Sequence, residues 1–168
     1  MNLRFYIEKL RSSEEFQKFE KENPQAFFCS GFLSIDKEGN DNKTHLDYFS
    51  PQSKKGFSFQ IEDGIKLIEL ESFSQEIPGK ISEDIDLELN EIESLILEKM
   101  KEENINNKIQ KIVLSLQRFD DEDFLTGTIF ISMLGMIRIK ISLIGKKITD
   151  FEKKSLLDIM NVFKKNDN

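Results

Sequence analysis

The sequence is poor in the residues that most catalytic and metal sites need. Its 168 residues include one histidine, one cysteine and no tryptophan. One cysteine cannot form an internal disulfide, and one histidine is too few for the zinc sites that are built from cysteine and histidine. Any serine or cysteine nucleophile that relies on an imidazole would have to use His45. We therefore expect no metal site and no cofactor.

Long apolar segments are also absent. No run of about 18 or more apolar residues occurs, and the first residues lack the order of basic, apolar and small side chains that is typical of a signal peptide. We expect a cytoplasmic protein without a membrane partner. The net charge of −7 also disfavours binding to nucleic acid, because lysine and arginine contacts to phosphates supply most of that affinity.

The charge is spread unevenly along the chain. Residues 124–168 carry 8 basic and 4 acidic side chains, whereas residues 81–123 carry 5 basic and 13 acidic ones. In a terminal helix, residues about 11 apart lie about three turns apart and share one side. Lys153 and Lys164, with Lys154 and Lys165 beside them, would therefore form a basic stripe on the predicted helix. This stripe could contact the acidic segment Glu91–Glu103, remain solvated, or face an anionic partner. We expect one of the first two, and keep these lysines as candidate partner-binding residues: Lys153, Lys154, Lys164 and Lys165.

Hydrophobic periodicity divides the first half of the chain into a helix and four strands. Ser12 and Glu15 have the spacing of a capping box, and Phe16 and Phe19 follow on one face, which predicts a helix that ends at Asn23. Alternating residues predict strands over residues 26–35, 44–50, 57–61 and 65–71. Short links between consecutive strands predict an antiparallel meander.

The second half repeats this order after a break at residues 72–80. A helix is predicted over residues 90–104, with strands over 109–117, 125–134 and 136–144. Thr149 and Glu152 have capping-box spacing and predict a terminal helix. The fold class is therefore α+β, an antiparallel meander sheet of about seven strands with three helices packed on one face. We expect one domain over residues 1–168, with a candidate internal boundary at 72–80 between two similar units.

One segment adds a family resemblance. From Asn90 onward, the order of a helix and strands, with the ending Ile144-Gly145-Lys146-Lys147-Ile148-Thr149-Asp150-Phe151, resembles a PepSY or cystatin-like unit. The resemblance covers the C-terminal half only. Members often have an acidic residue and a glycine before the last turn, where this chain has Leu143-Ile144-Gly145. The family is associated with peptidase regulation and ligand binding, so the resemblance implies a binding module, in which a helix lies across a curved sheet, and the chain would hold two tandem cystatin-like units.

Acidic clusters offer weak matches to calcium loops. The cluster Asp120–Asp123 lacks the alternate spacing and the glycine of such a loop. The segment Asp36–Asp41 has its glycine at the fourth position and not the sixth, and Asp47 replaces the closing glutamate. We interpret the first cluster as a solvated hairpin turn and the second as a polar turn.

The remaining candidates lie on the predicted strands. His45 and Asp47 share a strand face, which permits an imidazole oriented by a carboxylate, although a solvated strand face explains the pair equally well. Cys29 lies in an apolar run and is interpreted as a buried packing residue. Phe28 and Phe32 are expected opposite Leu33, where they form an apolar patch for a partner unless a helix covers them.

These observations lead to two hypotheses about function. The first is a non-enzymatic cytoplasmic binding or assembly module, which would contact a protein partner or a second copy through Phe28, Phe32 and the four lysines. The second is a small-molecule pocket protein or enzyme of cone-shaped α+β fold that uses carboxylates and His45. A pocket that contains His45 would favour the second hypothesis. The sequence does not predict the oligomeric state.

Overall fold

The computed structural model describes residues 2–70, 77–85 and 87–155. The helices in these residues are α1 (Leu3–Arg11), α2 (Glu14–Glu22) and α3 (Leu89–Glu102). The strands are β1 (Phe27–Asp36), β2 (Lys43–Ser50), β3 (Lys55–Gln60), β4 (Lys66–Leu70), β5 (Ile109–Phe119), β6 (Glu122–Ile131), β7 (Gly135–Ser142) and β8 (Lys147–Ser155). The predicted α+β class is confirmed.

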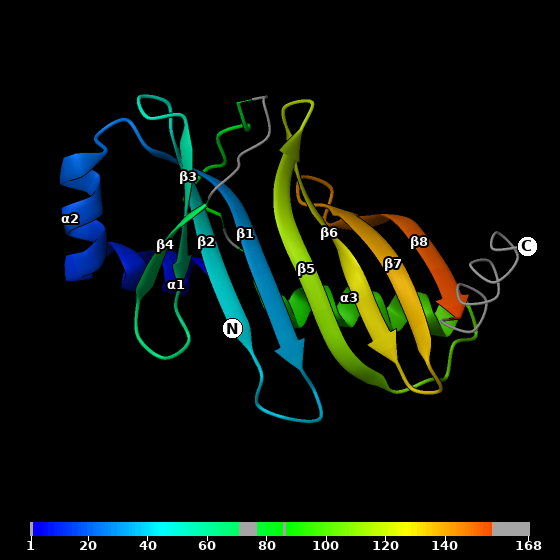
Figure 1. The fold of residues 1–168 in the computed structure, drawn as a ribbon. Coiled ribbons are helices and arrows are strands. Elements are labelled where there is room, and N and C mark those ends of the chain that lie inside the picture. The colour runs from blue at the N-terminus through cyan, green and yellow to red at the C-terminus, as the bar shows by residue number, and fades with distance from the viewer. Residues whose placement is uncertain (1, 71–76, 86, 156–168) are drawn as a thin grey trace, which may run out of the picture.

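All eight strands form one open sheet in the order β4-β3-β2-β1-β5-β6-β7-β8, and every neighbouring pair is antiparallel (Figure 1). Each half of the chain contributes a meander of four strands. The halves join where β1 pairs with β5, from Gly31 opposite Leu116 to Asp36 opposite Lys111. Hydrogen bonding is therefore continuous from one half to the other. The division into two similar units stays a prediction, and part of its boundary, residues 72–76, lies outside the described residues.

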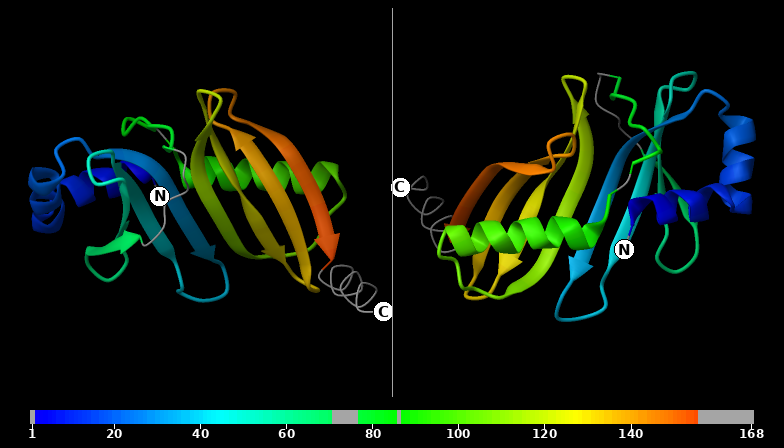
Figure 2. Two further views of the ribbon diagram at one scale, coloured as in Figure 1. Left: turned by 45° about the horizontal axis from the view of Figure 1, so that its top comes forward. Right: turned by 180° about the vertical axis from the view of Figure 1, so that it is seen from behind.

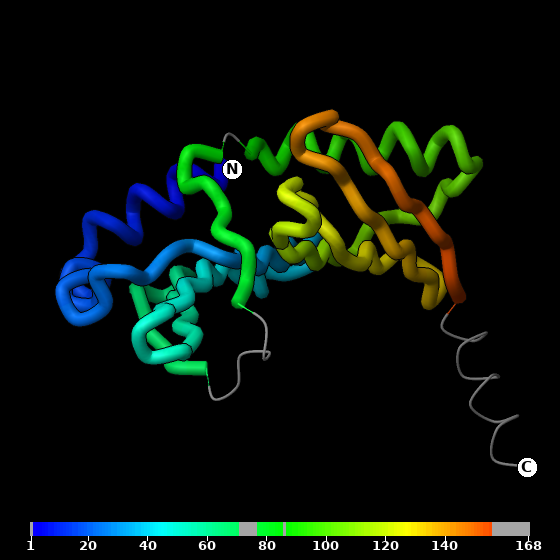
Figure 3. Tube along the Cα trace, turned by 90° about the horizontal axis from the view of Figure 1, so that it is seen from above, coloured from blue at the N-terminus to red at the C-terminus, as the bar shows by residue number. Residues whose placement is uncertain are grey.

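The helices cover one face of the sheet. α1 and α3 lie across the strands on the same side, as the rear view in Figure 2 and the view from above in Figure 3 show. α2 packs Phe16 and Phe19 against Tyr48 and Phe59, which point to that side. The opposite face, which we call the helix-free face, is turned toward the viewer in Figure 1.

Strand alternation explains this division. Between Ile112 and Leu116 of β5 and between Leu125 and Ile131 of β6, the residues that point toward the helices are buried apart from Gly127, and those that point away are half-buried. Gly127 allows β5 and β6 to approach closely, because a Cβ atom there would lie 2.0 Å from the carbonyl oxygen of Val113. No helix in the described residues is long and apolar enough to cross a membrane.

The helices begin at positions that the capping patterns did not predict. α1 was not predicted. α2 has Ser13 as its N-cap, whose side chain accepts a hydrogen bond from the Phe16 amide, while Ser12 forms the C-cap of α1. α3 begins at Leu89, one residue before the predicted start, and its N-cap Glu88 makes no side-chain capping bond. Of the three helices in the described residues, α1 is the one that the sequence did not predict.

The helix predicted to start at Thr149 is wrong, because residues 147–155 form the edge strand β8. A register shift lies between Lys140 and Ile141, so that Ile148 and Phe151 pair with Ile141 and Ile139 on one face. This irregularity gives an apolar spacing of three, which resembles a helical period. Residues 156–168, the rest of that predicted helix, lie outside the described residues.

Candidate functional site

The middle of the helix-free face carries no charged side chain on its three central strands. Strand pairing aligns Phe32 with Ser115 and Ser115 with Thr126, and the next row aligns Ser34, Val113 and Thr128. We call the following set the charge-depleted patch: Ser30, Phe32, Ser34, Val113, Ser115, Gln117, Phe124, Thr126 and Thr128. Most of these side chains are half-buried. The patch therefore presents hydroxyl groups, one amide and apolar groups, mostly rings. Charge returns in the next row, where Asp36 pairs with Lys111 and Lys111 with Phe130.

Charged residues flank this patch on β2, with Lys43 and Asp47, and on the other side on β7 and β8. On β7 and β8, Arg138 pairs in register with Glu152, and Lys140 with Asp150. The ammonium of Lys140 also lies 3.9 Å from the centre of the Phe124 ring, a cation–π contact at the edge of the patch. The uncharged centre thus has a charged rim.

Asp47 lies beside the patch on β2, opposite Ser30 and Ser58 of the neighbouring strands. Burial raises the pKa of the Asp47 carboxyl, although hydrogen bonds from the Ser58 and Ser30 side chains and the nearby His45 oppose that rise. The serine hydroxyls therefore compensate only part of the cost of burying this carboxylate. The three side chains form a polar cluster that links β1, β2 and β3.

His45 extends the cluster toward the ends of β2 and β3. Its Nε2 atom lies 3.5 Å from a carboxylate oxygen of Glu62, and its ring centre lies 5.3 Å from that of Phe32. A cavity of about 360 Å³ opens here, lined by His45, Gln60, Glu62, Asp63 and residues 40–43. The arrangement orients the imidazole. Among the described residues, no serine or cysteine side chain hydrogen-bonds to it, so the geometry of nucleophilic catalysis is not formed there.

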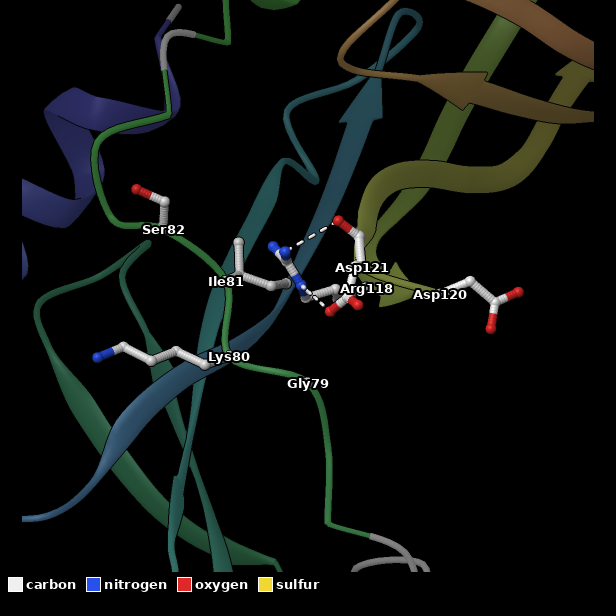
Figure 4. Close-up of a pocket in the computed structure, with 7 residues that line it drawn as sticks. All are labelled: Gly79, Lys80, Ile81, Ser82, Arg118, Asp120 and Asp121. Carbon is white, nitrogen blue, oxygen red and sulfur yellow. Dashed lines mark hydrogen bonds and ion pairs between the residues drawn. The ribbon is translucent and has the colours of Figure 1, made fainter.

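A larger and more open cavity of about 790 Å³ lies where residues 79–82 pass the β5–β6 turn (Figure 4). Arg118 is its central side chain. The guanidinium donates hydrogen bonds to a carboxylate oxygen of Asp123 at 3.0 Å and to the backbone carbonyl of Asp121 at 2.9 Å. These acceptors already engage the Arg118 cation, and the second cation that lines the cavity is the exposed Lys80.

The structure separates the two aromatic residues that the sequence placed on one face. A β-bulge at Cys29, between Phe28 and Ser30, shifts the register of β1. Phe28 therefore pairs with Tyr48, shares the core face with Leu33 and is buried, whereas Phe32 lies on the helix-free face. The expected patch of Phe28 and Phe32 is wrong, because the bulge inverts the alternation between them. Phe32 remains a candidate for partner binding.

Two of the four lysines of the predicted stripe, Lys153 and Lys154, lie on the edge strand β8 and not on a helix. Lys153 lies opposite Ile137 on the helix side of β8, and Lys154 lies opposite Met136 on the other side. Lys164 and Lys165 lie outside the described residues. The basic third of the chain does contact the acidic helix, but through Lys146, whose ammonium lies 3.2 Å from a carboxylate oxygen of Glu91.

The interpretation of Cys29 as a buried residue is confirmed. Burial, together with the nearby charge of Asp47, raises the pKa of its thiol to about 12, and the Sγ atom lies 3.4 Å from the Asp47 carbonyl oxygen. The acidic cluster forms the β5–β6 turn, as predicted, with Asp120 and Asp121 at its tip. Within residues 2–70, 77–85 and 87–155, no group of three or more histidine, cysteine and acidic side chains is placed to hold a metal ion.

Sequence reasoning missed the charge-depleted patch. Its members come from three strands that are neighbours only in the folded sheet, so the signal could be read only after the β1–β5 pairing was known. A weaker signal was available, since in residues 112–117 of the predicted strand Ile112, Leu114 and Leu116 alternate with the uncharged residues Val113, Ser115 and Gln117.

Comparisons with known proteins give one finding. No family model matches the sequence, and no curated protein matches it. A similar solved structure is that of a predicted lipoprotein from Clostridium difficile 630, which is 16% identical, with a TM-score of 0.47 over 84% of this chain and 91% of that one. A likeness of this size carries no argument about function, and the resemblance to PepSY or cystatin-like units stays an expectation.

Proposed function

We propose that this chain is a non-enzymatic assembly module, in which the charge-depleted patch packs against the same patch of a second copy. The observation that carries the proposal is the composition of that patch. In a chain with 33% charged residues, the three central strands present none on the middle of their helix-free face. Depletion of charge and enrichment in aromatic residues are typical of the cores of protein interfaces.

The chemistry of the patch suits a second copy. Hydroxyl and amide groups both donate and accept hydrogen bonds, so Ser115, Thr126 and Gln117 can pair with their own counterparts across a two-fold axis. A charged patch would repel its copy. Two antiparallel sheets also pack readily face to face. These properties favour self-association over binding to a partner of opposite charge.

The net charge of −7 opposes this association. Salt screens repulsion between exposed charges, whereas contacts inside a buried interface are screened much less. We therefore expect the association to strengthen as the salt concentration rises.

Sedimentation equilibrium of the full chain over a wide concentration range tests the proposal. Thr126→Glu and Thr126→Lys place opposite charges in the patch, and both should abolish a concentration-dependent increase in mass. Thr149→Glu on the exposed surface of β8 is the matched control and should leave the increase unchanged. A monomer at every concentration and salt level would overturn the proposal. So would equal association of all three variants, provided that their circular dichroism shows native folding.

The cavity beside His45 favours a second candidate function, a site for a small molecule. Its volume of about 360 Å³ falls within the range of ligand pockets. An NMR screen of anionic and neutral fragments should then shift the resonances of His45 and Gln60, and His45→Ala should remove the response. Fragments that shift only residues outside the cavity would argue against this site.

A cytoplasmic location is part of the proposal. It rests on the sequence argument and on Cys29, which is free and buried and needs no oxidising compartment.

A further inference from the structure

The turn between β6 and β7 combines two unfavourable features. Met133 and Leu134 are 88% and 59% exposed to solvent, and their φ angles are 65° and 57°. Left-handed backbone is strained for residues with bulky side chains, and exposed apolar side chains lose the benefit of burial.

The β5–β6 turn shows that the backbone alone does not require these residues. There, Asp120 and Asp121 also have positive φ angles, 46° and 63°. Aspartate and asparagine tolerate left-handed backbone well, and aspartate is polar enough for an exposed tip. Two turns of one sheet thus hold similar backbone conformations with opposite side-chain chemistry, and turn geometry does not explain Met133 and Leu134.

Lysines surround the apolar tip. The turn is held by Asn107, whose side-chain amide donates to the Ser132 carbonyl at 3.0 Å, and by the Lys108 amide, which donates to the Ser132 hydroxyl at 3.1 Å. Lys153 reaches the Asn107 side chain at 3.4 Å, and Lys154 pairs in register with Met136 just after the turn. Two carboxylates are near these cations, Glu38 at 3.5 Å from the Lys108 ammonium and Glu152 at 3.4 Å from that of Lys154.

We propose that the β6–β7 turn is a contact site for the surface of an anionic membrane. Met133 and Leu134 enter the interfacial layer, and Lys108, Lys153 and Lys154 contact the negative headgroups. The size of the tip favours a membrane over a protein, because a stable protein interface buries about 800 Å² on each partner and two side chains form only a fraction of that. Apolar side chains combined with a basic cluster do give reversible membrane binding.

Met133 and Leu134 lie in the turn between β6 and β7, outside the charge-depleted patch, so this site does not depend on the proposed function. The expectation that the protein has no membrane partner came from the lack of a long apolar run, which excludes a spanning segment. Contact with the interfacial layer requires no such run.

Co-sedimentation of the full chain with phosphatidylserine–phosphatidylcholine vesicles tests the proposal, with pure phosphatidylcholine vesicles as the neutral comparison. Met133→Asn combined with Leu134→Gly removes the apolar tip and relieves the strained backbone. We expect this variant to melt at a higher temperature than the parent chain while the bound fraction falls at least about fivefold. The matched control is Asp120→Asn with Asp121→Gly at the other turn, which should bind like the parent chain.

The lysines are tested separately. Replacing Lys108, Lys153 and Lys154 by glutamine should weaken binding to the anionic vesicles, and added salt should do the same. Replacing Lys18, Lys21 and Lys66, which lie on α2 and β4, is the control and should have little effect.

The proposal is overturned if the parent chain binds neither kind of vesicle, if the tip variant binds as well as the parent, or if neutral vesicles bind as strongly as anionic ones. A self-association that only the tip variant loses, without vesicle binding, would assign the tip to a protein contact instead.

Discussion

The two halves of the molecule each cover a four-stranded meander with helices, two in the first half and one in the second, but they bury different side chains. In the first half, aromatic rings fill the space between α2 and the strands. The ring centre of Phe59 lies 5.4 Å from that of Phe16, 5.1 Å from that of Phe19 and 5.7 Å from that of Tyr48. In the second half, the buried residues under α3 are aliphatic: Ile92, Ile96, Met100, Ile112, Leu114, Leu116, Leu125, Ile129, Ile131, Ile137, Ile139 and Ile141.

This contrast shows what the extra helix contributes. α2 provides Phe16 and Phe19, which complete the aromatic cluster over β2 and β3, and the second half has no described counterpart to it. Aliphatic side chains pack beneath the single helix α3. Aromatic rings are larger and prefer edge-to-face contacts, which need partners from a further element. The number of helices therefore matches the buried side chains: two helices cover the half with the aromatic cluster, and one helix covers the aliphatic half.

The largest expected effect comes from the centre of the aromatic cluster. Phe59 is fully buried, so Phe59→Ala should lower the free energy of unfolding by about 3 to 5 kcal/mol, through lost transfer free energy and a cavity. Chemical denaturation measures the change. Phe5→Ala is the control, because Phe5 is 62% exposed, and it should cost little.

The same experiment tests how far the two halves are coupled. Both tyrosines, Tyr6 and Tyr48, belong to the first half, so tyrosine fluorescence reports on that half while circular dichroism reports on the whole chain. Because the β1–β5 ladder joins the halves, we expect both signals of Phe59→Ala to change in one shared transition. Loss of fluorescence at a denaturant concentration that leaves much of the circular dichroism intact would instead divide the chain into two domains.

The next largest loss of stability is expected at a glycine near the junction of the two halves. Gly127→Ala should destabilise the protein by about 3 kcal/mol or more, because its Cβ would lie 2.0 Å from the Val113 carbonyl oxygen and would force β5 and β6 apart. Gly31→Ala on β1 is the matched control, since its Cβ would meet the nearest atom, of Leu116, at 3.5 Å, an ordinary contact. Thermal melts compare the melting temperatures of the two variants. Similar values would show that β5 and β6 can separate at Gly127 at little cost in stability.

Strand alternation was the most predictable feature, because side chains in a half-covered antiparallel sheet obey a period of two. It placed strands β1 to β7 and the one-sided packing of the helices. It failed where the backbone departs from regular pairing. The bulge at Cys29 moved Phe28 into the core, and the irregularity in β8 gave Ile148 and Phe151 a helix-like spacing. Bulges depend on the partner strand, so a single segment does not reveal them.

The candidate site was less predictable than the fold. His45 and Asp47 were recognised as neighbours on one strand face, but Ser30 and Ser58 joined them only through pairing with β1 and β3. The left-handed backbone at Met133 and Leu134 had no sequence signal at all, since neither residue favours it. Residues of a surface that is assembled from several strands become visible only with the register.

A smaller effect concerns α2, the helix without a described counterpart in the second half. Ser13→Ala removes the side chain that caps the Phe16 amide and should cost about 1 kcal/mol of stability. Ser12→Ala is the control, because the exposed Ser12 hydroxyl donates to the Glu8 carbonyl and does not cap α2. Denaturation midpoints of the two variants provide the measurement. A larger loss of stability for Ser12→Ala than for Ser13→Ala would indicate that Ser12 caps α2, as the sequence predicted.

The smallest expected effect is one of charge within the first half, where Asp47 and Asp36 have opposite pKa directions. Burial raises the pKa of Asp47 above its ordinary value of 3.8, so ionisation opposes folding and this contribution lowers stability as the pH rises through that range. Asp47→Asn should therefore stabilise the protein at neutral pH, with a gain that disappears below about pH 3.8.

Hydrogen bonds from the Glu38 and Gly39 amides lower the pKa of Asp36, so Asp36→Asn should destabilise the protein at neutral pH and have no effect in acid. Unfolding free energies measured from acidic to neutral pH test both signs. A loss of stability in Asp47→Asn at neutral pH would mean that the Ser30 and Ser58 hydroxyls favour the ionised carboxylate more than burial disfavours it.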